Sequence, residues 1–268
     1  MLEQVTPVLL TYNENRNIGR TLAHLGWAKD IVVVDSGSTD GTLTTLEKFS
    51  KVRVFNRHFD THGNQWRYAT EQTNIETEWL LRLDADYQMS AALVAELARL
   101  EPVTAVSAYR VAFDYAVFSR KLVSSLYPPK AILLRRGRFS VSDKGHADVW
   151  DVRGDVVTLK GRITHDDHKP ISQWLIGEGR CLQRELDWMM RLRKAGPVHW
   201  LRVRPPLMPI AVFLYCLFGK GLILNGRAGI FYALQRMVAE AVLSLMVLEE
   251  KWRDDAARTD APPVSHDR

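Results

Sequence analysis

Residues 80–89 read LLRLDADYQM, a leucine-rich run that ends in two carboxylates, Asp84 and Asp86. The run is typical of a buried strand, and in a strand residues i and i+2 lie on the same face. Two like charges would then lie side by side, which is unfavourable unless a cation binds there. Oxygen ligands without a nearby histidine or cysteine suit Mg²⁺ or Mn²⁺, which commonly bridge carboxylates to phosphates. The alternative is a plain turn, because aspartate is a common turn former.

The rest of the first hundred residues alternates strand and helix patterns around this segment. Strand-like runs occupy 5–12, 31–34, 52–57 and 79–86, and helix-like runs occupy 17–28, 40–50, 63–74 and 90–100. This order predicts an α/β fold, with a mostly parallel, Rossmann-like sheet flanked by helices on both faces. From residue 104 the strand patterns become longer and less regular, at 104–118, 131–141 and 155–165, and a helix pattern follows at 171–195. We expect these strands to extend the sheet in antiparallel fashion.

Polar clusters follow the predicted strands. They read TYNEN (11–15), DSGSTD (35–40) and DAD (84–86), and ligands of parallel sheets bind at the carboxyl ends of the strands. Asp35 could accept hydrogen bonds from ribose hydroxyls or from a base edge, or residues 36–40 could simply build a turn and a helix cap. The cluster is not a phosphate loop of the GxxxxGK[ST] kind, because no lysine follows its glycine.

Composition and charge indicate which kinds of partner the protein can bind and in which compartment it is found. Hydrophobic residues at 46% and charged residues at 25% indicate a folded protein. The net charge of +5 suits an anionic ligand or an anionic membrane surface. We predict no nucleic-acid partner, because no basic run is interleaved with aromatic residues. Two cysteines without metal or disulfide spacing, and an N-terminus without a signal-peptide pattern, favour the cytoplasm.

Residues 206–250 form an apolar block interrupted by charges. Three interpretations remain open for it. Its helices could close the core, could lie on the cytoplasmic leaflet with basic residues facing anionic lipid, or could cross the bilayer, which needs about 20 mostly apolar residues. We favour the interfacial interpretation over the core one, and both over a membrane span.

Four segments resemble family 2 glycosyltransferases with the GT-A fold, in order and in spacing. They are PVLLTYNENRNIGRTLAHL (7–25), IVVVDSGSTDGT (31–42), HGNQWRYA (62–69) and LLRLDADY (80–87). More narrowly, the chain resembles the bacterial branch that builds lipopolysaccharide cores and related surface glycans. The resemblance spans residues 4–250 and is most specific over the first hundred.

The resemblance implies an inverting, metal-dependent glycosyltransferase with a nucleotide-diphosphate sugar donor and a glycan or glycolipid acceptor. A divalent metal, Mn²⁺ or Mg²⁺, would bind Asp84 and Asp86 and neutralise the charge that develops on the leaving diphosphate. Gln65 and Arg67 would lie near the nucleotide or the donor sugar. The residues implied to contact the nucleoside are Thr11, Tyr12, Glu14 and Asp35.

An inverting transfer also needs a base for the acceptor hydroxyl. Where relatives of this branch commonly carry a His–Glu pair, this chain reads DKGHADVWD (143–151). His146 matches the histidine, but Ala147 replaces the acid. Asp148 is therefore our candidate base, with Asp143 and Asp151 as alternatives.

The segment HDDHKPISQW (165–174) resembles the loop on the acceptor side. We assign His165 a supporting role there, together with Trp174. Processive relatives carry an Arg-Trp pair where this chain has Gln173 and Trp174, so processive synthesis is not expected. A metal cluster in this segment is disfavoured, because neighbours in one turn coordinate an ion with awkward geometry.

The predicted organisation is a glycosyltransferase domain at 1–200, membrane-associating helices at 201–252 and a polar, disordered tail at 253–268. Within the domain, residues 1–103 would bind the nucleotide sugar and residues 104–200 the acceptor. The expected location is the inner face of the cytoplasmic membrane. Two alternatives remain, a nucleotidyltransferase and a catalytically silent nucleotide-sugar-binding protein, which the missing acid at 147 would suit.

Overall fold

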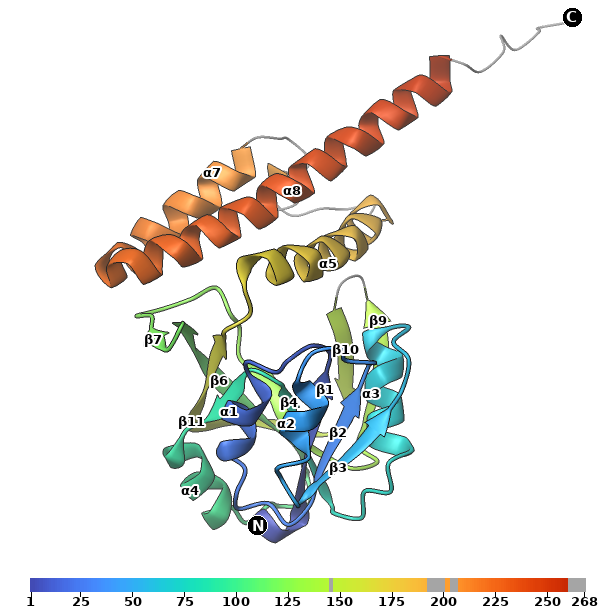
Figure 1. Ribbon diagram of the computed structural model, residues 1–268, viewed down its shortest axis with the longest axis vertical. Coiled ribbons are helices and arrows are strands. Elements are labelled where there is room, and N and C mark those ends of the chain that lie inside the picture. The colour runs from blue at the N-terminus through green and yellow to red at the C-terminus, as the bar shows by residue number, and fades with distance from the viewer. Residues whose placement is uncertain (145–146, 192–200, 203–206, 260–268) are drawn as a thin grey trace, which may run out of the picture. The chain divides into compact units, whose positions relative to one another are not determined.

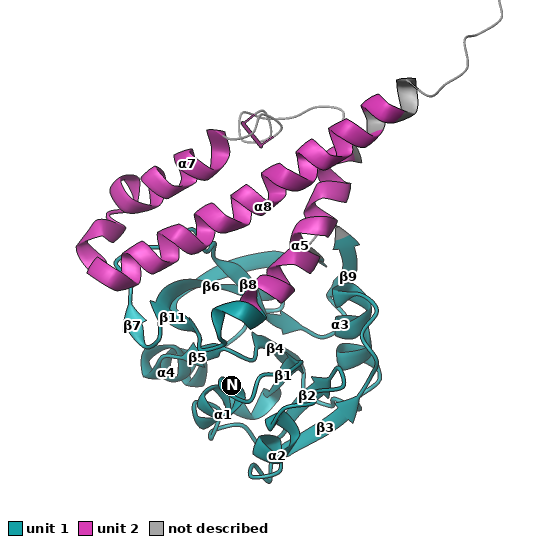
Figure 2. Ribbon diagram, turned by 45° about the horizontal axis from the view of Figure 1, so that its top comes forward, with its two compact units in different colours: residues 1–173 teal, residues 174–268 magenta. Residues whose placement is uncertain are grey.

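The computed structural model describes residues 1–144, 147–191, 201–202 and 207–259, apart from the side chains of 144, 147, 148, 191, 254 and 257–259. The chain divides into two compact units, residues 1–173 and 174–268 (Figure 2). This division by packing lies upstream of residue 200, where we expect the glycosyltransferase domain to end. The functional boundary remains a prediction.

The first unit is built on a nine-stranded sheet of order β3-β2-β1-β4-β8-β6-β11-β5, with β7 paired to β6 (Figure 1). Its strands are β1 Val5–Thr11, β2 Ile31–Asp35, β3 Val52–Asn56, β4 Trp79–Asp84, β5 Tyr87–Met89, β6 Val106–Val117, β7 Arg120–Lys121, β8 Lys130–Arg135 and β11 Asp155–Asp167. A separate two-stranded sheet pairs β9 Phe139–Lys144 with β10 Ala147–Val152.

Parallel pairing in the first half brings the polar clusters to one edge. β1 pairs in parallel with β2, which places Thr11 opposite Asp35, and with β4, which places Leu10 opposite Asp84. β2 pairs in parallel with β3. The carboxyl ends of these strands therefore meet, as the alternating pattern predicts.

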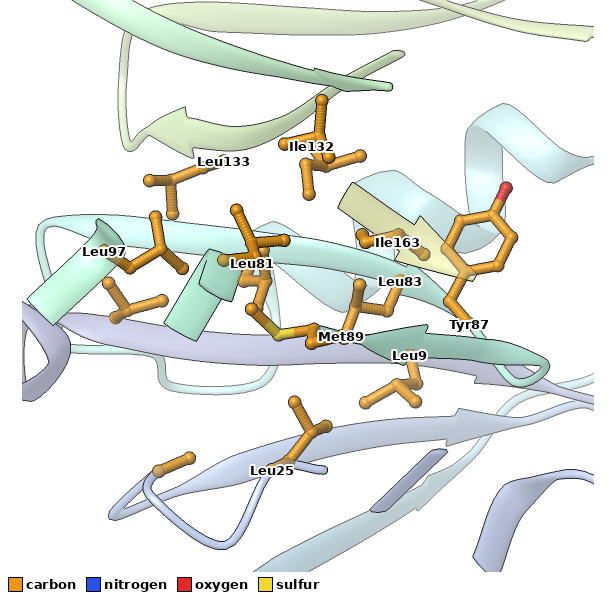
Figure 3. Packing of buried hydrophobic residues seen from close by; sticks show 14 of the residues in the cluster. Leu9, Leu25, Leu81, Leu83, Tyr87, Met89, Leu97, Ile132, Leu133 and Ile163 are labelled. Atoms are coloured by element: carbon orange, nitrogen blue, oxygen red, sulfur yellow. The ribbon is translucent and has the colours of Figure 1, made fainter. Parts of the chain in front are cut away.

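Helices cover both faces of this sheet, which confirms the predicted α/β class. On one face lie α1 Ile18–Ala23, α2 Thr42–Leu46 and α4 Ala91–Arg99, whose leucines pack on Leu9, Leu81 and Leu83 of the sheet (Figure 3). On the other face, α3 His62–Glu71 and the β9–β10 ribbon pack through Trp66 and Val141. Helix α4 begins at Ser90, whose hydroxyl caps the Leu93 amide at 3.1 Å.

The second half extends the sheet, largely as expected. β8 is antiparallel to β4 and to β6, and β5 is antiparallel to β11. The pair β6–β11 is parallel instead, because the chain crosses back through β8, β9 and β10 before it enters β11. The run 131–141, predicted as one strand, is divided between two sheets, and Gly137 with φ 75° makes the turn between them.

The described part of the second unit is helical. α5 Ile171–Arg191 begins in the first unit and confirms the helix predicted from residue 171, whose last residues, 192–195, lie outside the described ones. α7 Leu207–Leu214 and the π-helical turn η2 Tyr215–Gly219 lead through η3 Leu222–Asn225 into α8 Gly226–Thr259. Leu182, Leu186 and Met189 of α5 pack against Leu243 and Val247 of α8.

One helical stretch, Leu222–Arg253, is long and apolar enough to cross a membrane by length and composition alone. About a third of its most apolar window (33%) is buried. A core helix of a soluble protein can pass the same test, so this finding is weak evidence for membrane association.

Candidate active site

A pocket of about 270 Å³ lies where β1, β2 and β4 end. Much of the predicted site lines it: Thr11, Tyr12, Glu14, Gln65, Asp84, Asp86 and His165. Its other lining residues are Leu10, Ser36, Phe59, His62, Ala85 and Tyr127. The fold therefore gathers residues from positions 10 to 165 around one cavity.

The two carboxylates of the opening segment differ in their surroundings. The Asp84 side chain is 43% exposed and lies 4.0 Å from the Lys130 ammonium. The Asp86 side chain is 11% exposed, and its Oδ2 is 3.0 Å from Nε2 of His165. Its second oxygen, Oδ1, is buried and has no hydrogen-bond partner among the described residues. A buried carboxylate oxygen without a partner is costly unless an ion or a ligand binds it.

The electrostatics keep Asp86 ionised. Burial by itself raises its pKa, but the interaction with His165 and the charge of Lys169 outweigh burial, so the net pKa lies well below its ordinary value. An anionic Asp86 is the state in which the carboxylate can bind a cation.

The donor set fits a hard divalent cation that shares its coordination with a ligand. Among the described residues, no group of three or more histidine, cysteine, aspartate or glutamate side chains is placed to hold a metal. Mg²⁺ does not need such a cage, since it is usually held by one or two carboxylates, waters and substrate phosphates. The unpartnered Oδ1 of Asp86 and the half-exposed Asp84 suit that arrangement.

Asp35 lies behind the pocket wall rather than on its surface. It is fully buried and accepts from Thr11 Oγ1 at 3.0 Å and from Ser38 Oγ at 2.6 Å. It also accepts from the amides of Gly37 and Ser38 at 2.9 and 2.8 Å. The carboxylate therefore fixes the turn that presents Ser36 to the pocket, which is the turn-building alternative considered for it.

The loop after β1 is held by the loop after β2. Asn13 adopts φ 55°, donates its amide to Ser38 Oγ at 2.8 Å and accepts the Thr39 amide at 2.8 Å. This bracing presents Tyr12, whose side chain is 47% exposed, at the pocket rim. An exposed ring at a pocket rim is suited to stacking on a planar base.

Glu14 is part of a mostly buried ionic cluster that the sequence did not indicate. Its Oε1 is 2.7 Å from the Lys169 ammonium, and its Oε2 accepts from Asn17 at 2.8 Å. Lys169 also lies 3.2 Å from Asp167. Burial raises the pKa of Glu14 to about 7, although the charge of Lys169 opposes the shift. Lys169 therefore adds a fixed positive charge beside the pocket.

The two residues predicted on α3 are placed differently. Gln65 is fully buried and donates to Ser36 Oγ at 2.8 Å and to the Arg57 carbonyl at 3.0 Å. Arg67 is exposed, bonds Asn64 and is not among the residues that line the pocket. In a helix, residues two apart face different directions, so of these two residues Gln65 alone reaches the cavity.

Lys130, Tyr87 and Tyr127 form a group that the sequence did not predict, and Tyr127 of this group lines the pocket. Lys130 donates to Tyr87 at 3.0 Å and to Tyr127 at 2.6 Å, and its ammonium lies over the Tyr127 ring at 4.6 Å. The ring of His165 packs on Tyr115 and on Tyr127 with centroids 4.7 Å apart. Tyr127 precedes two prolines in an irregular loop, where no periodicity indicates its position.

The segment 143–151 is only partly described. His146 and the side chain of Asp148 lie outside the described residues, although the backbone of Asp148 pairs with Asp143 across the ribbon. Asp143 accepts from Thr61 Oγ1 at 2.7 Å and from the Gly63 amide at 2.8 Å, so it caps the start of α3. Asp151 is exposed. The choice of base thus stays a prediction.

The two residues expected on the acceptor side, His165 and Trp174, belong to different units. His165 joins the pocket through Asp86, as described above. Trp174 belongs to the second unit, where its ring lies 5.7 Å from the guanidinium of Arg236. The neighbouring Gln173 belongs to the first unit and donates to the Asn13 carbonyl at 2.8 Å.

Comparison with known proteins agrees with this architecture. The model of the family described as glycosyl transferase family 2 matches residues 7–146. The "Lipopolysaccharide core biosynthesis glycosyltransferase LpsC" of Rhizobium meliloti (strain 1021) is 25% identical over 241 residues, 84% of this chain and 85% of that protein.

Two solved structures share low identity with the chain. S. aureus TarS (residues 1–349) in complex with UDP-GlcNAc is 13% identical, with a TM-score of 0.43 over 94% of this chain and 92% of that one. Glucosyl-3-phosphoglycerate synthase from Mycobacterium tuberculosis with Mn²⁺ and UDP-glucose is 20% identical, with a TM-score of 0.33 over 41% and 43%. The family match, which covers the polar strand ends and most of the pocket, favours glycosyl transfer over nucleotidyl transfer. The chain belongs to glycosyl transferase family 2 and is a nucleotide-sugar glycosyltransferase.

Proposed function

We propose that the chain is an inverting, metal-dependent glycosyltransferase that moves a sugar from a nucleotide-diphosphate donor to a lipid-linked surface glycan, such as a lipopolysaccharide core. The observation that carries the metal-dependent part is the pair Asp84 and Asp86 in the pocket wall, with Oδ1 of Asp86 buried and unpartnered. The acceptor class is supported by the lipopolysaccharide-core name of the relative that is 25% identical.

Different residues around the pocket would bind the metal, the base and the rest of the nucleoside of the donor. Asp84 and Asp86 would hold Mn²⁺ or Mg²⁺, and the ion would neutralise the leaving diphosphate. Tyr12 would stack on the base, and Thr11, Glu14 and Asp35 would shape the nucleoside site, with Asp35 acting through the turn that it fixes.

Other side chains would set the geometry and move the proton. Gln65 would orient the donor from α3, whereas Arg67, which does not line the pocket, is assigned no part in donor binding. His165 fixes one oxygen of Asp86 and so would orient the other toward the cation. Asp148, two residues after His146 in the sequence, would accept the proton of the attacking hydroxyl. Residues 104–200 would hold the acceptor.

Calorimetry with UDP and GDP in the presence of Mn²⁺ tests the donor site. Asp86→Ala should weaken metal-dependent nucleotide binding by more than the roughly 10–100-fold that is typical for loss of an outer-shell partner. Asp114→Ala is the matched control, because Asp114 is also a mostly buried carboxylate, paired instead with Lys121 and Arg162. Unchanged affinity in Asp86→Ala would refute the metal assignment.

We also propose that residues 201–252 attach the protein to the inner face of the cytoplasmic membrane. Between residues 188 and 239 the sequence has eight lysines and arginines and no aspartate or glutamate. Large apolar side chains are exposed on the same stretch: Leu207, Ile210, Leu214, Tyr215, Phe218, Ile223, Leu224, Ile230 and Leu234. Apolar surface together with positive charge is the combination that binds anionic lipid interfaces.

Cell fractionation tests the attachment. The protein should sediment with membranes, and high salt should release only part of it, because salt screens the charges and leaves the apolar contact intact. Replacement of Phe218 and Leu224, which are 66% and 82% exposed, by serine should shift the protein to the soluble fraction. Wild-type protein found wholly in the soluble fraction would contradict the proposal.

A further inference from the structure

The turn between β6 and β7 carries a bulky aromatic residue in an unfavourable backbone conformation. Val117 pairs with Arg120, so Phe118 and Ser119 form a two-residue hairpin turn, with φ values of 45° and 64°. Such turns favour asparagine and glycine, since positive φ is unfavourable for other side chains. Strained residues of this kind persist where the surrounding structure enforces them, commonly at functional sites.

A buried carboxylate holds this turn in place. Asp166, whose side chain is 2% exposed, accepts the Ser119 amide at 3.0 Å and forms an ion pair with Arg20. His168 Nε2 lies 3.1 Å from the same carboxylate and 3.3 Å from Ser119 Oγ. The conformation of the turn is therefore fixed by β11, by α1 and by the segment after β11, rather than by the preference of its own residues.

The turn lies beside the proposed donor site. β6 runs in the direction of β4, because each is antiparallel to β8, so both strands end at the same edge of the sheet. His165 bonds Asp86 in the pocket, and the next residue, Asp166, holds the turn. Tyr115 is the strand partner of His165 and leads three residues later to Phe118. The turn is thus on the side of the carboxylates away from β1 and β2, where the nucleoside would bind.

We propose that Phe118 is a stacking platform for a sugar ring of the acceptor glycan; this inference rests on the proposed glycosyl transfer. Its side chain is 49% exposed, and its ring is backed by the His168 ring at 5.5 Å. The apolar C–H face of a sugar packs on a flat aromatic surface, while its hydroxyls stay in water. An acceptor held there would face the donor sugar from the side opposite the nucleoside.

Phe118→Asn separates the role of the ring from that of the fold. Asparagine tolerates positive φ, so this variant keeps or gains stability while it loses the ring. Saturation-transfer NMR with core oligosaccharides released from lipopolysaccharide by mild acid serves as the acceptor assay. Affinity should fall by about tenfold, the effect expected from one lost aromatic contact. Phe118→Trp should retain binding.

The controls distinguish this proposal from that for the donor site. Val103→Asn changes an exposed apolar residue that precedes the start of β6, whereas Phe118 follows the end of that strand. This variant should change neither nucleotide binding nor oligosaccharide binding. Affinity for UDP or GDP with Mn²⁺ should be unchanged in Phe118→Asn. If wild-type protein binds no nucleotide, the proposed function fails, whatever Phe118 does.

Three results would overturn the stacking proposal alone. The first is nucleotide binding by wild-type protein without any saturation transfer to the oligosaccharides. The second is equal oligosaccharide affinity in wild-type and Phe118→Asn proteins. This result would overturn the proposal also where Phe118→Asn loses binding to anionic vesicles, since Phe118 would then contact lipid and not the glycan. The third is a parallel loss of nucleotide and oligosaccharide affinity, which would show that the turn has only a structural role.

Discussion

The contact between Asp143 and the first turn of α3 predicts that Gly63→Ala destabilises the wild-type protein but not the Asp143→Ala variant. Asp143 accepts from Thr61 Oγ1 and from the Gly63 amide at 2.7 and 2.8 Å, at the positive end of the helix dipole. A Cβ added at Gly63 would lie 2.6 Å from Asp143 Oδ2 and 2.8 Å from its Cγ. The two residues are therefore sterically coupled.

The magnitudes follow from these contacts. Asp143→Ala removes a capping carboxylate from a partly solvated site and should destabilise the helix by about 1–2 kcal/mol. Gly63→Ala should cost a similar amount, since the new methyl group displaces the same carboxylate. In the Asp143→Ala background the obstacle is gone, and alanine should be neutral or should stabilise by up to about 1 kcal/mol.

Hydrogen exchange resolved to peptides of residues 62–71 in the full-length chain measures the local free energy of opening for all four proteins. The interaction free energy of the cycle, which is the difference between the effects of Gly63→Ala in the two backgrounds, should be about 1–3 kcal/mol. Additive costs, with Gly63→Ala equally harmful in both backgrounds, would refute the geometry. Asp143→Asn should also retain most of the transfer activity if Asp148 is the base, as we propose.

Further predictions concern catalysis and packing. Asp148→Asn should keep nucleotide binding and should lower turnover by roughly 10²–10⁴-fold, whereas Asp151→Asn should change it little; near wild-type rates in Asp148→Asn would exclude Asp148 as the base. His165→Ala should weaken Mn²⁺-dependent nucleotide binding by roughly 10–100-fold, as measured by calorimetry, because it releases one oxygen of Asp86. Ser90→Ala should cost about 1 kcal/mol in urea unfolding through loss of the α4 cap, and a cost near zero would contradict the assigned cap.

The sequence alone predicts the α/β class of the fold and the end of the sheet at which the ligand binds. The alternation of strand and helix periods between residues 5 and 100 predicts a parallel sheet, since parallel strands need a crossover between them. Carboxyl ends of parallel strands then meet, so DSGSTD and DAD had to lie at one edge. Local patterns suffice here, because each element is set by residues close together in the chain.

Long-range partners could not be predicted from the sequence. Nothing near Asp86 indicates His165, and nothing near Glu14 indicates Lys169, because these contacts join segments far apart in the chain. Asp35 looked available to a ligand, yet the folded loop saturates its oxygens with its own amides and hydroxyls.

Tertiary structure also decided the order of the second half of the sheet. Irregular strand patterns show that β6, β8 and β11 exist, but strand periodicity is the same in either pairing direction, so it cannot show that β6 and β11 run in parallel. Phe118 has no local preference for positive φ; the buried carboxylate of Asp166, 48 residues further along the chain, imposes that conformation. Short-range preference sets the elements, whereas burial and charge between distant segments set the site.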